Sequence, residues 1–257
     1  MKIIKLKKLS GSKYEIVLDD NKITTFDNVI LKYNLLYKKE LSNEELKKII
    51  NDSNYYEVYN KTLKYATKKI RSEMEINKYL DKFDIKESDK NKIIIKFKEL
   101  NFINDRVYTK AFISDKIHIS KYGIDKIKKL LKQEGIDNTI IEEEISKIDT
   151  SEVKLNLENK IKKKIENNNK YSNYELKNKI LDYFINQGYK REDILFYLEK
   201  YKKEDNDILK KEFNKLYSKY KNKYDKNIFI VKLKQKLYQK GFTNEQINNL
   251  IQEKTEE

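Results

Sequence analysis

The chain has 257 residues, of which 57 are basic and 42 acidic, so its formal net charge is +15. It contains no cysteine, which excludes a disulfide framework, a thiolate nucleophile and a cysteine metal site. No apolar run approaches the roughly 20 residues that span a bilayer, and the first residues contain no apolar signal-peptide core, so we expect a soluble, cytoplasmic protein with no membrane contact.

The first 27 residues have a β-prone pattern. Short runs at Ile3–Leu6, Tyr14–Leu18 and Ile23–Phe26 are separated by the turn-forming segments Ser-Gly-Ser and Asp-Asp-Asn-Lys. They predict a small β-hairpin or three-stranded meander over 1–27. Such a sheet is marginally stable alone, so it must pack on the first helices.

Connecting helices are expected over 28–54. Ser42 and Glu45 have the spacing of a capping box and predict a helix that begins there and continues through Ile50. The polar run Asp52-Ser53-Asn54 is expected to break that helix.

Three of the five glycines, Gly135, Gly188 and Gly241, recur at a constant interval of 53 residues. Apolar residues stand eight and four positions before each glycine and one, six and ten positions after it. This frame is typical of a helix that ends at a left-handed glycine, with the next residue packing back on the helix. The pairs predicted to pack are Ile136 with Leu131, Tyr189 with Phe184 and Phe242 with Leu237. The pattern predicts a tandem helical repeat.

Each unit has room for three helices of about 11–12 residues with short turns. We expect repeats over 55–101, 104–148, 151–202 and 204–254. Capping-box spacing occurs at Ser172 with Glu175 and at Thr243 with Gln246. Each unit exposes an apolar face that only a neighbour covers. The predicted fold is therefore mainly α, with tandem three-helix repeats in an elongated, curved array and a small N-terminal β-hairpin or meander.

The residues that could support catalysis are few. His118 is the only histidine, and a single histidine between two isoleucines is typical of a structural residue. Glu142, Glu143 and Glu144 are consecutive, so their side chains splay around a helix and do not converge on a metal. The sequence contains neither a phosphate-binding loop nor a dinucleotide-binding glycine motif. We therefore predict a protein that is not an enzyme and needs no cofactor or metal.

The basic residues cluster in three places, which are Lys64, Lys68, Lys69 and Arg71; Lys126, Lys128, Lys129 and Lys132; and Lys160, Lys162, Lys163 and Lys164. A contiguous basic stripe would follow a phosphate backbone. Spacings of one to four residues also wrap around a helix, and any single cluster is better explained as a solvated face. Likewise, the 20 tyrosines could stack on bases, but most have helical registers that favour packing.

Residues 64–148 carry three motifs in a fixed order. Lys69-Ile-Arg-Ser-Glu-Met-Glu75 is similar to an R-x-R-S-E-x-E/L signature, with lysine in its first basic position. Phe102-Ile-Asn-Asp-Arg-Val-Tyr108 follows, with Ala111-Phe112 one turn later. Tyr122-Gly123, Ile127, Leu131 and Gly135-Ile136 complete the third motif. In this order and spacing the stretch resembles the RecX family of recombinase regulators.

The resemblance implies tandem three-helix repeats and no catalysis. Family members bind in the helical groove of the RecA–DNA filament, bridge neighbouring protomers and limit filament growth or favour disassembly. They thereby damp ATP hydrolysis, strand exchange and co-protease activity in homologous recombination, DNA repair and the SOS response. We accordingly expect a monomer whose partner is the RecA filament, with single- or double-stranded DNA as a further partner.

The candidate contacts with filament or DNA are Lys64, Lys68, Lys69, Arg71, Glu73, Arg106, Lys110, Lys126, Lys129 and Lys132. Arg71 and Glu73 either orient a corner of the first repeat, which we favour, or contact the filament. Asp105 is predicted to cap the helix through Ala111. Two other functions stay open: a basic repeat protein that coats nucleic acid and competes with other DNA-binding proteins, and a generic helical scaffold.

Overall fold

The structure is a computed structural model that describes residues 1–256. It is mainly helical, as predicted, and divides into two compact units. The first unit consists of Met1–Ala111 and Lys132–Ile141. The second consists of Phe112–Leu131 and the described residues from Glu142 onward.

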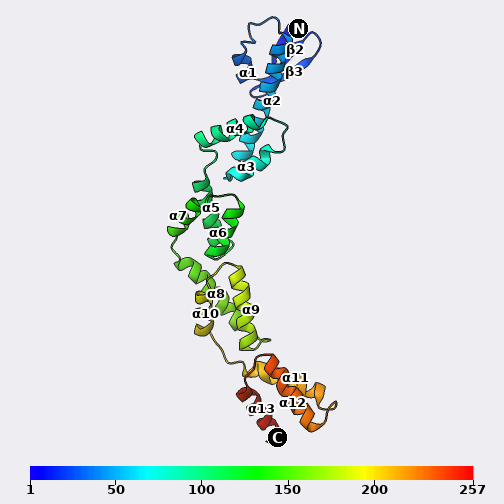
Figure 1. Ribbon diagram of the computed structural model, residues 1–257, viewed down its shortest axis with the longest axis vertical. Coiled ribbons are helices and arrows are strands. Elements are labelled where there is room, and N and C mark those ends of the chain that lie inside the picture. The colour runs from blue at the N-terminus through cyan, green and yellow to red at the C-terminus, as the bar shows by residue number, and fades with distance from the viewer. Residues whose placement is uncertain (257) are drawn as a thin grey trace. The chain divides into compact units, whose positions relative to one another are not determined.

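The N-terminal strands β1 (Ile3–Lys8), β2 (Lys13–Leu18) and β3 (Lys22–Phe26) form an antiparallel sheet in the order β1-β2-β3. This confirms the predicted three-stranded meander. The sheet lies beside α1 (Asp27–Lys32) and α2 (Asn43–Ala66) in Figure 1. The apolar residues buried together in this part of the chain are Ile16, Leu18, Val29, Ile30, Leu35, Leu41, Leu46 and Ile49. The sheet thus buries its apolar side chains against helices, which a three-stranded sheet needs for stability.

Helix α2 begins as predicted, with Ser42 and Glu45 forming a complete capping box. The predicted break at 52–54 is wrong, because α2 continues to Ala66. Ser53 Oγ donates to the Ile49 carbonyl at 2.6 Å and meets Thr25 Oγ1 of β3 at 2.7 Å, with both side chains buried. Tertiary partners therefore satisfy a polar side chain that would otherwise compete with the helix.

The remaining helices are α3 (Glu73–Leu80), α4 (Glu87–Glu99), α5 (Asp105–His118), α6 (Ile124–Gln133), α7 (Asn138–Ser146), α8 (Ser151–Glu166), α9 (Asn173–Asn186), α10 (Arg191–Lys200), α11 (Asn206–Tyr220), α12 (Lys226–Gln239) and α13 (Asn244–Glu256). In the second unit, α10 packs on both α8 and α9, while α11, α12 and α13 pack together (Figure 1). The residue boundaries predicted for the four repeats stay a prediction.

The three periodic glycines end helices in the left-handed conformation, as predicted. Gly135, Gly188 and Gly241 have φ values of +76°, +82° and +87°. Tyr189 N donates to the Phe184 carbonyl at 3.0 Å, the bond expected when the chain turns back on a helix end. The rings of these two residues also meet edge to face, with centroids 5.7 Å apart.

The first turn of another helix also packs against each of these glycines. A Cβ on Gly135 would lie 2.7 Å from Met74 Cε of α3. A Cβ on Gly188 would lie 2.2 Å from Lys126 N of α6, and one on Gly241 would lie 2.5 Å from Tyr174 Cβ of α9. The N-terminal turns of α3, α6 and α9 therefore pack on the glycine ends of α6, α9 and α12 respectively. We call these contacts the first, second and third junctions.

Candidate functional site

Arg71 lies between α2 and α3 and is 9% exposed. Its Nε donates to the Tyr65 carbonyl at 2.9 Å, and its Nη1 donates to Glu75 Oε1 at 3.1 Å. The guanidinium lies 3.5 Å from the centroid of the Tyr65 ring, which stacks in turn on Tyr79. An arginine that is desolvated, stacked and hydrogen-bonded in this way ties its surroundings together. The geometry favours the orienting role of Arg71, while its contact with a partner stays a prediction.

Glu75 connects this corner to the start of α3. Ser72 N donates to Glu75 Oε2 and Glu75 N donates to Ser72 Oγ, each at 3.2 Å, so the two residues form a capping box. Glu75 Oε1 also pairs with Lys69 Nζ at 3.1 Å. Sequence reasoning missed this box, although the Ser-x-x-Glu spacing at 72–75 signals it.

The predicted N-cap role of Asp105 is wrong. Asn104 caps α5, since its Oδ1 accepts hydrogen bonds from Arg106 N and Val107 N, each at 3.1 Å. Asp105 is the first residue of α5, and its Oδ1 accepts from the backbone N of Glu73 at 3.2 Å. Asp105 therefore caps the first turn of α3. Burial raises the pKa of its carboxyl above the usual range for aspartate.

The same arrangement recurs 100 residues further along the chain. Ser172 Oγ accepts from Glu175 N at 3.2 Å at the start of α9, as Ser72 does at the start of α3. Asn173 N donates to Asp205 Oδ2 at 2.8 Å, as Glu73 N does to Asp105. In both places the aspartate lies 32 residues after its donor. Residues of the first motif therefore serve helix junctions, and that role recurs where the motif itself is absent.

The other candidate contacts have different surroundings. Glu73 forms an ion pair with Lys98 Nζ at 2.8 Å. The side chains exposed to solvent are Lys64, Lys68, Lys69, Arg106, Lys110, Lys129 and Lys132, which lie on or next to α2, α5 and α6. The structure thus buries Arg71 in the first junction, where Arg71, Glu73 and Lys69 have ion-pair partners, and all seven cations are exposed.

Lys126 differs from these seven because it is half-buried. Its Nζ donates to Gln187 Oε1 at 3.1 Å and lies 4.0 Å from the centroid of the Tyr122 ring. Backbone bonds hold this second junction together, with Gly123 N donating to the Gln187 carbonyl at 2.8 Å. A candidate from the second basic cluster is therefore held against the end of α9.

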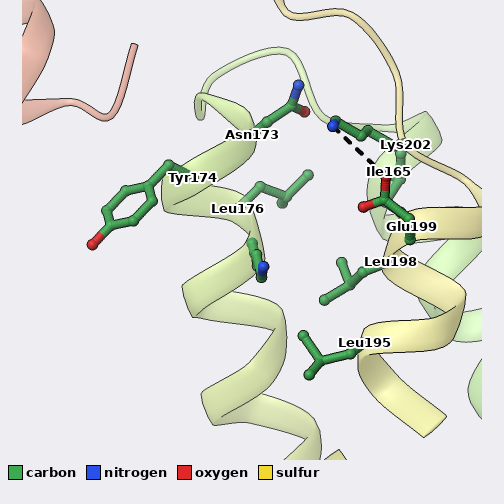
Figure 2. Close-up of a pocket in the computed structure, with 9 residues that line it drawn as sticks. Ile165, Asn173, Tyr174, Leu176, Leu195, Leu198, Glu199 and Lys202 are labelled. Carbon is green, nitrogen blue, oxygen red and sulfur yellow. Dashed lines mark ion pairs between the residues drawn. The ribbon is translucent and has the colours of Figure 1, made fainter. Parts of the chain in front are cut away.

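The second unit contains a pocket of about 210 Å³ between α9 and α10. Leu176, Leu195 and Leu198 point toward one another across it, and an ion pair between Glu199 and Lys202, 3.7 Å apart, lies at its rim at the end of α10 (Figure 2). Tyr174 points away from these leucines. The lining is an apolar gap between two helices with a charged edge, and it brings no nucleophile and base together.

His118 lies outside that pocket, and its Nδ1 is 2.6 Å from Glu152 Oε1 on the surface. Among the side chains that the structure describes, no three His, Asp or Glu groups are placed to hold a metal ion. Among the described helices, none is both long and apolar enough to cross a membrane.

Known proteins match the chain over most of its length. A family model described as RecX, second three-helix domain, matches residues 104–144. Regulatory protein RecX of Streptococcus gordonii is 30% identical over 263 residues, which cover 98% of this chain and 99% of the relative. Regulatory protein RecX of Bacillus cytotoxicus is 27% identical over 264 residues, which cover 99% of this chain and 97% of the relative.

Two solved structures share the fold. A crystal structure of regulatory protein RecX has a TM-score of 0.65 at 19% identity, covering 77% of this chain and 98% of that chain. RecX from Lactobacillus salivarius has a TM-score of 0.53 at 24% identity, covering 58% and 96%. With the motif residues arranged at helix junctions and a full-length relative at 30% identity, the chain belongs to the RecX family of regulatory proteins.

Proposed function

We propose that the chain is a non-catalytic, negative regulator of the RecA recombinase. It binds in the groove of the RecA–DNA filament in the cytoplasm and limits the growth or stability of that filament. Its effect on ATP hydrolysis, strand exchange and co-protease activity follows from fewer or shorter filaments. The full-length similarity to proteins named regulatory protein RecX is the observation that carries this proposal.

The positions of the candidate residues support a division of labour. Arg71 and Glu73 set the first junction through contacts inside the first unit. The seven exposed cations, from Lys64 to Lys132, are the groups that meet the acidic protein lobes or DNA of the filament. Charges at the rim of such an interface mainly raise the association rate and set specificity. The net charge of +15 is suited to a polyanionic filament.

The test is ATP hydrolysis by the cognate RecA on single-stranded DNA, with this protein added after filaments have formed. Progressive loss of hydrolysis at few copies per filament is expected, because a protein that blocks growth acts on many protomers at once. Full activity until the DNA is saturated with this protein would contradict the proposal. A matched addition of protein with Lys64 and Lys68 changed to glutamine checks that the effect needs the exposed cations.

Direct coating of nucleic acid is the competing function, and a lysine cluster in the second unit favours it. Salt dependence separates the two functions. Phosphate binding weakens steeply with salt, with a slope proportional to the number of phosphates neutralised. Groove binding to protein is less steep and requires the nucleotide-bound filament.

A further inference from the structure

Three lysines from separate segments meet beside the second junction. Lys160 of α8 is half-buried, and its Nζ donates to the Lys121 carbonyl at 2.6 Å. The same carbonyl accepts the hydroxyl of Tyr189 at 2.8 Å, which fixes the loop before α6. Burial lowers the pKa of Lys160, and the nearby positive charges of Lys121 and Lys126 lower it further. The three side chains therefore form one positive region, although Lys160 lies 39 residues from Lys121 in sequence.

Next to these lysines the surface is hollow. A cavity of about 410 Å³ is lined by Lys160, Lys163, Lys164, Asn167, Tyr183 and Phe184. Tyr183 is 45% exposed, and its ring rests edge to face on buried Phe184 with centroids 4.9 Å apart. Lys164 Nζ lies 4.4 Å from the centroid of the Tyr183 ring. An exposed, supported aromatic ring and several ammonium groups thus share one hollow.

Within the described residues, none of the five lysines 121, 126, 160, 163 and 164 forms an ion pair with a carboxylate. Their neighbours in the same unit do so: Lys128 pairs with Glu142, and Lys200 pairs with Glu158 at 2.6 Å. Charges of one sign that are grouped without counter-ions attract a polyanion. The five lysines therefore form a positively charged group without a carboxylate partner among the described residues.

We propose that this hollow binds single-stranded nucleic acid, with phosphates at the lysines and one base stacked on Tyr183. Ammonium groups beside an accessible aromatic ring are the two elements that single-strand binding surfaces combine. A duplex keeps its bases stacked internally and could use only the lysines. An acidic peptide would likewise leave the aromatic ring unused. We name this surface the α8–α9 hollow.

The test uses the full chain and a fluorescein-labelled oligothymidylate, with binding followed by anisotropy across a series of salt concentrations. Lys163→Gln/Lys164→Gln should lower the salt slope by roughly 1.4, or 0.7 for each phosphate that is no longer neutralised. The matched control is Lys154→Gln/Lys162→Gln, which removes the same charge from the same helix outside the hollow. It should leave the slope near that of the unaltered chain. Lys160 stays unchanged in both, because it is half-buried and bonded to a carbonyl.

The ring is tested separately. Tyr183→Ala should weaken oligothymidylate binding by about fivefold to 150-fold, the range expected when one base can no longer stack, whereas Tyr183→Phe should keep the affinity. Unaltered melting midpoints confirm that both variants are folded.

The proposal would be overturned if the two double-lysine variants had equal effects on the salt slope, or if Tyr183→Ala bound the oligothymidylate as tightly as the unaltered chain. It would also be overturned if the chain bound a polyglutamate peptide or a duplex as tightly as it binds the oligothymidylate. No RecA enters this assay, so its failure leaves the regulator proposal standing.

Discussion

The first and third junctions use one backbone plan with different side chains. Both begin with a serine N-cap, and both place an aspartate 32 residues after the amide that it accepts. The residue before the serine differs, being Arg71 in one case and Tyr171 in the other. In the third junction the side chain of Asn168 holds that residue instead, bonding to both the N and the carbonyl O of Tyr171.

The third junction forms without an arginine at this position, so the two junctions show which contacts are shared and which are particular to Arg71. Serine and aspartate satisfy amides of the first helical turn, which have no partners within the helix. The segment before the serine must also be fixed, and either an arginine or an asparagine does this. Arg71 is therefore replaceable as a tether, whereas its cation on Tyr65 and its pair with Glu75 are particular to the first junction.

The largest predicted difference between the first and third junctions is the loss of stability when their glycines are replaced. Gly241→Ala should lower the free energy of unfolding by about 2–5 kcal/mol, since the left-handed backbone costs 1–2 and overpacking adds 1–3. The added Cβ would lie 2.5 Å from Tyr174 Cβ, an atom fixed to the α9 backbone. Gly135→Ala should cost only about 1–2 kcal/mol, because the facing atom is the flexible end of Met74.

Urea unfolding and hydrogen exchange across α12 and α13 measure this difference. Gly11→Ala is the matched control, because Gly11 has a φ of +64° with nothing within 4 Å of an added Cβ. It reports the backbone cost alone. Equal losses at Gly241 and Gly11 would show that the close approach in the third junction has no energetic weight.

The next largest loss of stability is expected on substitution of Arg71. Arg71→Ala should cost about 2–3 kcal/mol, because it removes two hydrogen bonds and a desolvated cation–ring contact and leaves Glu75 with fewer partners. Arg71→Lys should recover part of that stability, since an ammonium keeps the charge but not the planar fork. Thermal unfolding and RecA ATPase inhibition are measured on the same samples. If both are unchanged in Arg71→Ala, neither the orienting role nor the contact role of Arg71 holds.

Helix ends were the most predictable part of this fold. A glycine with positive φ leaves a signal at one position, and the apolar residues around it repeat at helical spacing. The capping pairs at Ser42 and Thr243 are equally local, and both form in the structure. The β-meander followed from alternating patterns and turn residues, which also act over a few positions.

The errors arose where a distant partner decides the role of a polar residue. Ser53 was expected to end a helix, but Thr25 and a carbonyl one turn back bond to its hydroxyl inside the helix. Asn104 and Asp105 are both good caps, and only tertiary packing shows that Asp105 faces the start of α3. The sequence also could not show that Lys160 lies close to Lys121 and Tyr183, because neither residue is near it in sequence.

The two aspartates give a smaller difference between the junctions. Asp205 is 5% exposed and accepts from both Asn173 N and Gln246 Nε2, at 2.8 and 2.9 Å. Asp205→Ala should therefore cost about 2–3 kcal/mol, and Asp105→Ala, which removes one longer bond, about 1 kcal/mol. Chemical denaturation of the two variants measures the difference. A larger effect for Asp105 would mean that its bond with Glu73 is stronger than the 3.2 Å distance indicates.

The smallest effect is a pH dependence at Asp105. Its folded pKa is raised, chiefly by burial, so the folded chain holds the proton more tightly than the unfolded chain. The associated stability is present below the unfolded pKa of about 3.9 and is lost as the pH rises through the folded pKa. Asp105→Asn cannot ionise, and its amide oxygen can still accept from Glu73 N. Relative to the unaltered chain, the melting midpoint of Asp105→Asn should therefore rise as the pH increases from about 4 to 7.

Asp105→Ala serves as the control, because it removes the ionisable group and the acceptor together. It should show the same trend with pH from a lower starting midpoint. A midpoint difference for Asp105→Asn that shrinks as the pH rises would mean that the ionised carboxylate is stabilised here, with Lys98 outweighing burial.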